Sequence, residues 1–178
     1  SVMGASFSRE VIAQLCPEVP DLGATLGSLV HLQLLRQESD RLASDYGRYH
    51  FVQSGMRQVA YGTLARRQRK SIHLTAVQVM EDGDNSAGEV SPVIAQHLLE
   101  AIDAMPEAED AADLTARMLT HLELAAKRSA ALGSPGEAAA HLRLALSRCT
   151  DAARALAIES ALAEHLDRSG ETQSAIEH

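Results

Sequence analysis

The segment YHFVQSGMRQVAYGTLARRQRKSIH, residues 49–73, decides how the first half of the chain is interpreted. It opens with an alternating apolar stretch, breaks at Ser54 and Gly55, and continues as a helical pattern that ends in positive charge. Ser54 is of the residue type that caps a helix. The apolar side chains that follow are spaced for one helix face, which we expect to be buried within the chain: Met56, Val59, Ala60 and Leu64.

Before this segment, the pattern predicts two short helices and a hairpin. Ser8 precedes REVIAQLC and Asp21 precedes LGATLGSLVHLQLL, and both are good helix N-caps. The second helix is expected to bury Leu22, Leu26, Leu29, Val30 and Leu32 or Gln33. LLRQES then becomes strand-like, DRLASDYG forms a loop, and RYHFVQ returns as the second strand.

After this segment, the chain is expected to be helical. A long helix over residues 66–81 places Ile72, Val77 and Met80 inward, and DGDNSAGEVSP forms a loop. From Pro92 onward every segment has helical spacing, and each short connection carries Gly, Pro or Asp. This pattern indicates a series of antiparallel helix pairs.

A weak internal repeat supports the helix pairs. Ala126, Gly133 and Ala138 recur at one constant offset as Ala163, Gly170 and Ala175. Small residues at such positions let two helices approach closely, which resembles the tetratricopeptide repeat with its period of about 34 residues. The repeat departs from that pattern at Glu159 and Thr150. By this resemblance, a protein-binding wall is formed by Thr120, Glu123, Lys127, Ser160, Glu164 and Asp167.

Charge is distributed unevenly along the chain. Residues 1–76 hold nine Arg and Lys against six Asp and Glu, whereas residues 77–178 hold seven against eighteen. Aromatic residues are scarce, so Ala and Leu must fill the interior, which favours packed helices. We therefore expect two domains, a winged-helix-like domain over residues 1–80 and a helical-repeat arm over residues 85–178.

Several classes of function find no motif in the sequence. Cys16 and Cys149 form no CxxC pair, which fits a reducing, cytoplasmic compartment. None of the eight histidines lies three or four residues from another, so no metal site is expected. The stretch GATLGSL lacks the lysine of a phosphate-binding loop, and no catalytic constellation emerges. We expect no membrane span and no enzymatic activity in this chain itself.

The order of three motifs suggests a family. LLRQES, FVQSGMRQVAY and RRQRKSIH, together with the helices before them, resemble the winged-helix and linker region of the signal-transduction ATPases with numerous domains. In these bacterial regulators an AAA-type module precedes a winged helix and helical repeats, and the output is a LuxR-type transcription regulator, an adenylate or guanylate cyclase, or a kinase. The resemblance covers roughly residues 1–105 and implies ATP or ADP as a cofactor of the parent protein.

One position departs from the family. The family commonly has a His at the start of the helix after the strand, where it approaches the β-phosphate of bound ADP. This chain has Gln53 there, followed by Ser54. Gln can donate a hydrogen bond but carries no titratable charge. The two residues therefore form either a weakened nucleotide-sensing contact or only the end of a strand and a helix cap.

A basic face offers the competing interpretation. Arg57, Arg66, Arg67, Arg69 and Lys70 could contact phosphates, with Gln58 and Arg57 near base edges if the third helix entered a major groove. The apolar residues of that helix and the acidic rear half oppose this interpretation. A solvated face, or one that docks on an acidic neighbour, is favoured.

The sequence thus predicts a mainly α chain: a winged-helix-like domain with a short β-hairpin, then tetratricopeptide-like helix pairs. We expect a fragment of a longer protein that couples the nucleotide state of an ATPase module to an effector through protein–protein contacts. The alternative is a nucleic-acid-binding winged helix that uses the third helix and the Arg66–Lys70 run. An uncovered apolar end near Ala175 and Ile176 predicts further repeats or a homodimer.

Overall fold

The computed structural model describes residues 2, 6–39, 46–83 and 88–169. The chain forms two compact units, Ser1–Val79 and Met80–His178, so the boundary falls within a helix. Most of the predicted hairpin loop, part of the loop after residue 81, and the C-terminal segment with Ala175 and Ile176 lie outside the described residues.

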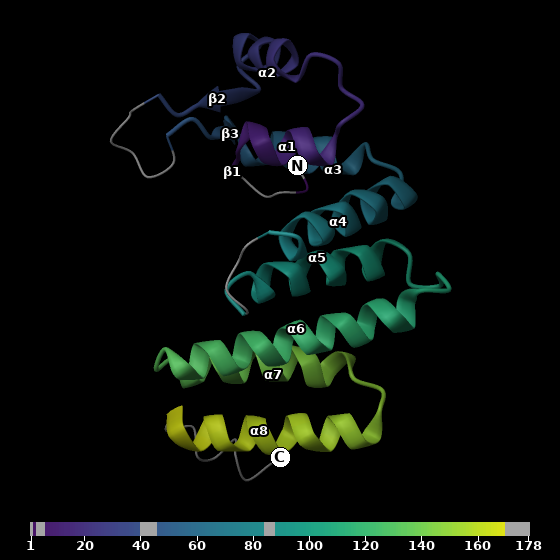
Figure 1. The fold of residues 1–178 in the computed structure, drawn as a ribbon, viewed down its shortest axis with the longest axis vertical. Helices are drawn as coiled ribbons and strands as arrows, with labels where there is room; N and C mark the ends of the chain where they lie inside the picture. Colours follow the sequence, from purple (N-terminus) through teal and green to yellow (C-terminus); the bar gives the residue numbers. More distant parts are fainter. Residues whose placement is uncertain (1, 3–5, 40–45, 84–87, 170–178) are drawn as a thin grey trace. The chain divides into compact units, whose positions relative to one another are not determined.

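The described residues form eight helices and three strands (Figure 1), which confirms the expectation of a mainly α chain with a small antiparallel hairpin. In chain order the elements are β1 (Ser6–Phe7), α1 (Arg9–Leu15), α2 (Leu22–His31), β2 (Leu35–Gln37), β3 (Tyr49–Phe51), α3 (Ser54–Gly62), α4 (Arg66–Glu81), α5 (Ser91–Ala104), α6 (Ala111–Ala131), α7 (Pro135–Arg148) and α8 (Ala152–Ser169). We call α5 to α8 the helical arm.

The small sheet of the first unit has the strand order β1-β3-β2, with both pairs antiparallel. Phe7 lies opposite Tyr49, and Leu35 lies opposite Phe51. The rings of Phe7 and Tyr49 stack with centroids 5.9 Å apart, and Phe7 meets Phe51 edge-on at 6.0 Å. Most of the chain's scarce aromatic area therefore forms one cluster, which Leu26 of α2 covers.

The first two helices of this unit, α1 and α2, begin at the predicted caps. Ser8 accepts a hydrogen bond from the Val11 amide at 3.3 Å, and Asp21 accepts one from the Ala24 amide at 2.8 Å. The predicted extent of α2 was wrong, because the helix ends at His31. Gln33 adopts a left-handed φ of 56°, which closes the helix and leaves Leu32 64% exposed.

The expected buried face of α3 was also wrong. Val59 is 70% exposed and Ala60 is exposed, and α3 contains no buried residue. The inward anchor is instead Tyr61, whose hydroxyl lies 3.0 Å from Nε2 of the buried His73 in α4. A ring of this size with a hydrogen-bonded tip stabilises the joint more than the small Val59 side chain could, so the helix turns Tyr61 inward.

Arg69 completes this joint between α3 and α4. Its guanidinium carbon lies 4.8 Å from the centroid of the Tyr61 ring, and it donates to the carbonyls of Leu64 and Gly62 at 2.9 and 3.0 Å. The carbonyls at the end of a helix lack intrahelical partners, so a cation there is favourable. Ser54, expected to cap α3, is its first residue, and Gln53 occupies the cap position with no side-chain bond.

The helical arm packs each helix on the next in antiparallel fashion (Figure 1). Its large buried side chains include Leu98, Met118, Leu122, Leu162 and Leu166. Between them lie alanines that are fully or almost fully buried, Ala125, Ala126, Ala138, Ala139 and Ala145, and these let α6 and α7 approach closely. Gly133 supplies the left-handed turn between α6 and α7, with a φ of 79°.

This close packing predicts a sharp contrast between two alanines of α7. Ala145 is 0% exposed, so Ala145→Leu should lower the free energy of unfolding by about 1–3 kcal/mol through overpacking. Ala140, on the exposed side of the same helix, accepts the same change with an effect within about 0.5 kcal/mol. Urea unfolding followed by circular dichroism measures both, and equal losses would contradict the close approach.

Candidate functional site

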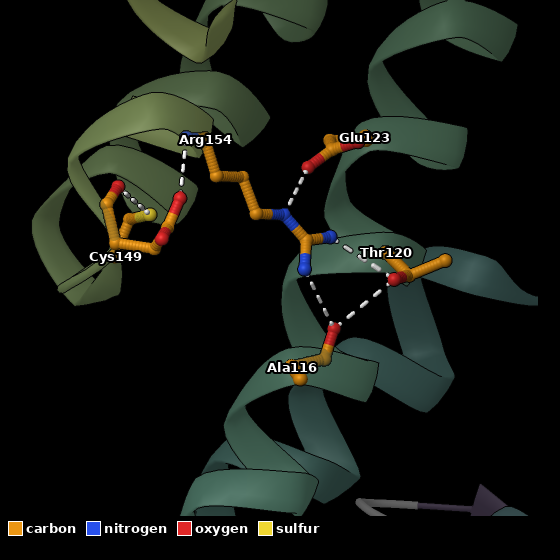
Figure 2. Close-up of polar contacts among 6 residues, drawn as sticks. Ala116, Thr120, Glu123, Cys149 and Arg154 are labelled. Atoms are coloured by element: carbon orange, nitrogen blue, oxygen red, sulfur yellow. Dashed lines mark hydrogen bonds and ion pairs between the residues drawn. The ribbon is translucent and has the colours of Figure 1, made fainter. Parts of the chain in front are cut away.

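The most developed polar cluster of the described residues joins α8 to α6 through Arg154 (Figure 2). The Arg154 Nε donates to Glu123 Oε1 at 2.8 Å, and its two terminal nitrogens donate to the Thr120 hydroxyl at 3.0 Å and the Ala116 carbonyl at 3.3 Å. The Thr120 hydroxyl also donates to the Ala116 carbonyl at 3.0 Å. One planar cation thus holds three acceptors along a single face of α6.

Asp151 fixes where this cation lies. Its carboxylate accepts a hydrogen bond from the Arg154 amide at 2.6 Å and so caps α8. Arg154 therefore sits in the first turn of its helix, where a positive charge opposes the helix dipole. Sequence reasoning missed this residue. The positive charge in the first turn was the available signal, because the helix dipole disfavours a cation there and an acceptor on another helix offsets that cost.

The predicted protein-binding wall divides into two sets. Thr120 and Glu123 hydrogen-bond to Arg154, and Lys127 follows them on the same side of α6. Ser160, Glu164 and Asp167 are exposed on α8, on a different side from the residues of α8 that meet α6. The structure therefore does not bring the six residues together on one surface.

A pocket of about 200 Å³ lies between α6 and α8, beside the Arg154 cluster. Its floor is apolar and includes Leu142 of α7 and Ile158 of α8, both almost fully buried. Glu123 and Arg154 line one part, and Lys127 and His165 line another. The pocket thus combines an apolar floor with ionisable side chains at its rim.

Two further arginines form bridges of the same kind. Arg117 of α6 donates to both carboxylate oxygens of Glu81, the last residue of α4, at 2.9 Å. Arg148 of α7 donates to Asp103 of α5 at 3.0 Å. In each case, as with Arg154, the arginine joins a helix to the one two places earlier in the chain.

The predicted basic face does not behave as one surface. Arg66 and Arg67 are exposed, whereas Arg57 and Lys70 are half-buried, and Arg69 is engaged with Tyr61 and two carbonyls. Gln53 and Ser54, the predicted nucleotide contact, are both exposed at the start of α3. The two regions remain candidate contacts.

Among the described residues, no three His, Cys, Asp or Glu side chains are arranged to hold a metal ion. His121 lies 3.5 Å from Glu81 and 3.2 Å from the Ser91 hydroxyl, whereas Nδ1 of His165 is buried with no hydrogen-bond partner. In the described part of the chain, no helix has the length and apolarity needed to cross a membrane.

Comparison with known proteins returns no relative: no family model, curated protein or solved structure matches this chain.

The Arg154 cluster predicts that geometry matters as well as charge. Arg154→Lys keeps the charge but cannot reach three acceptors at once, so it should lower the free energy of unfolding by about 1–2 kcal/mol. Arg148→Lys alters a single exposed pair and should cost less than about 0.5 kcal/mol. Urea unfolding compares the two variants, and a smaller loss at Arg154 than at Arg148 would contradict the role of the cluster.

His97 predicts a pH dependence of stability. It is 6% exposed within α5, and burial lowers its pKa from the ordinary 6.5, although Glu100 opposes the shift weakly. Below about pH 6.5 the unfolded chain takes up a proton that the folded protein excludes, so stability falls as pH drops toward the folded-state pKa, by at most about 1.4 kcal/mol per pH unit. His97→Leu should reduce this slope in unfolding measured from pH 8 to pH 5. A variant that keeps the full slope would contradict the assignment.

Proposed function

We propose that this chain is a regulatory interaction module, which couples the nucleotide state of an ATPase module to an effector output through protein–protein contacts. The observation that carries the proposal is the exposure of α3. Tyr61 of α3 contacts His73 of α4 and so holds α3 in the first unit. Val59 of α3 is nevertheless 70% exposed, and Val52, just before the helix, is 46% exposed. Two exposed valines beside a fixed helix favour docking on another protein surface.

The start of α3 gives this docking surface a plausible ligand contact. Gln53 and Ser54 are exposed there, and Gln53 uses no side-chain bond to cap the helix. The N-terminus of a helix favours an anion, because its amides lack acceptors and its dipole is positive. By the resemblance, this is the position that meets the ADP β-phosphate in the ATPase module, and Gln53 would donate there in place of the family's His.

The topology of the first unit is consistent with the winged-helix part of the proposal. A strand, two helices joined by a short turn and a hairpin follow one another, and β3 lies between β1 and β2. The second helix of a helix-turn-helix pair is the one that reads DNA, which here is α2. Its sequence LGATLGSLVH contains neither Arg nor Lys.

This assignment weakens the nucleic-acid alternative in its original form. α3 follows the hairpin and is not the second helix of the pair, and Arg69 serves the joint with Tyr61. Only Arg66 and Arg67 of the basic run are exposed. The alternative would therefore have to rest on two arginines at the start of α4, in a chain whose second half has a large excess of acidic residues.

In this proposal the helical arm presents the second protein contact. Leu156 is 68% exposed on α8, and Ser160, Glu164 and Asp167 are exposed on the same helix at spacings that continue its side. A single exposed leucine framed by polar residues suits a transient contact more than an obligate one. We assign the effector to this side of α8, and we assign no catalytic step to the chain.

The docking surface is tested by hydrogen exchange. When the nucleotide-binding module of the parent protein is added with ADP, amide exchange over residues 54–62 should slow by about tenfold or more. Val59→Asp places a charge in the contact and should abolish the slowing. Val93→Asp makes the same change at another exposed valine, 48% exposed in α5, and should leave the slowing intact.

Unchanged exchange over α3 in the unsubstituted chain would refute the coupling. The nucleic-acid alternative is measured separately by fluorescence anisotropy with a short DNA duplex at low and moderate salt. Affinity that falls steeply with salt and again in Arg66→Ala/Arg67→Ala would replace the proposed function with that alternative.

A further inference from the structure

The pocket between α6 and α8 has a polarity that the protein-contact role does not explain. Its floor is made by Leu142, Ile158 and Ala161, and about 200 Å³ is open above them. A space of this size admits a ligand on the order of ten non-hydrogen atoms. An apolar floor with few polar groups at the rim is typical of a small-molecule site.

Helix geometry places Lys127 and His165 at the same end of the pocket. α6 and α8 run in the same direction, because α7 returns between them, and Arg154 contacts Ala116. Lys127 and His165 each lie about three helical turns beyond those two residues. Both line the pocket, so a lysine and a histidine face it at the end away from Arg154.

Neither group has a partner in the described part of the chain. Lys127 is exposed and makes no ion pair or hydrogen bond there. Nδ1 of His165 is buried with no hydrogen-bond partner. An unpaired buried polar atom is unfavourable, and a ligand that accepts a hydrogen bond from it would remove that penalty. Nδ1 can donate when it carries the ring proton or when the imidazole is charged.

At the opposite end the charges are already matched. Glu123 binds Arg154 at 2.8 Å, so its carboxylate offers little attraction to a cation. The surplus charge of the pocket is therefore the ammonium of Lys127. The second unit as a whole carries eighteen acidic residues against seven basic ones, which repels polyanions. These two facts favour a monoanion with an apolar body over a phosphate ester or a nucleotide.

We infer that this pocket binds a short aliphatic monocarboxylate. The carboxylate accepts hydrogen bonds from Lys127 Nζ and from His165 Nδ1, which a rotation of the imidazole ring brings out of its buried position to the pocket. The hydrocarbon chain lies on Leu142 and Ile158. The site bridges α6 and α8, so its occupant would stiffen the junction that Arg154 also closes. The inference does not depend on the proposed ATPase coupling, because it concerns the arm alone.

Hexanoate is the probe, and amide resonances of the whole chain in two-dimensional NMR are the readout. Saturable shifts should gather in α6 and α8. 1-Hexanol, with the same body and no charge, should bind at least about tenfold more weakly, and hexylammonium should not bind. Equal affinity for hexanoate and hexanol, or shifts outside these helices, would overturn the assignment.

Matched variants separate the two contacts from general charge. Lys127→Met removes the ammonium at an exposed position and should weaken hexanoate about tenfold or more, whereas Arg148→Met, outside the pocket, should not. His165→Leu should weaken binding, and His165→Asn, which keeps a donor near the Nδ1 position, should restore part of it. Full affinity in Lys127→Met would overturn the site.

The carboxylate could also come from the end of a protein. A short acetylated peptide that ends in leucine is therefore titrated with a free C-terminus and as its amide. Weaker binding than hexanoate supports a small-molecule ligand. Binding of the free acid more than about tenfold tighter than hexanoate would overturn that choice in favour of a protein C-terminus.

Discussion

Arginine side chains that reach across one intervening helix are the interactions on which the order of the second unit depends. Arg117 joins α6 to the end of α4, Arg148 joins α7 to α5, and Arg154 joins α8 to α6. A guanidinium suits this task because its donors lie in one plane and stay charged. Each bridge is partly exposed, so it contributes only a small share of the free energy of unfolding. Its main effect is to fix the direction and register of one helix relative to another.

Small residues make these bridges possible. Where Ala126, Ala138 and Ala145 are buried, adjacent helices approach closely enough for a side chain to span from one helix to the next but one. Larger residues would separate the helices and move each acceptor out of reach. The buried alanines and the arginine bridges therefore act together. Close packing at the alanines sets the distance between helices, and the arginines set the register of one helix against another.

Local patterns in the sequence were sufficient to predict most helices. The helix over residues 66–81 and the helix caps at Ser8 and Asp21 are found where they were predicted. These features could be predicted because the signals for them come from neighbouring residues in the chain. β1 was not predicted, since two residues give no periodicity. The prediction of which side of α3 faces inward was wrong, because Tyr61 contacts His73 and Arg69 of α4. These contacts are made with another helix, so the spacing within α3 does not reveal them.

The candidate sites show the same division between local and distant information. Thr120, Glu123 and Lys127 lie on one side of α6, as their spacing indicates, but Arg154, the partner of Thr120 and Glu123, comes from a different helix. The only sign of that contact in the sequence was the positive charge of Arg154 in the first turn of its helix. Nothing in the sequence indicates that Nδ1 of His165 is buried without a hydrogen-bond partner, because a histidine on a helix can have many different surroundings.

Bridges between alternate helices also make the architecture modular. Each arginine depends on an acceptor two helices back, and on nothing farther away. Gene duplication could therefore add a pair of helices to such an array, or deletion could remove one, without redesigning the pairs that remain.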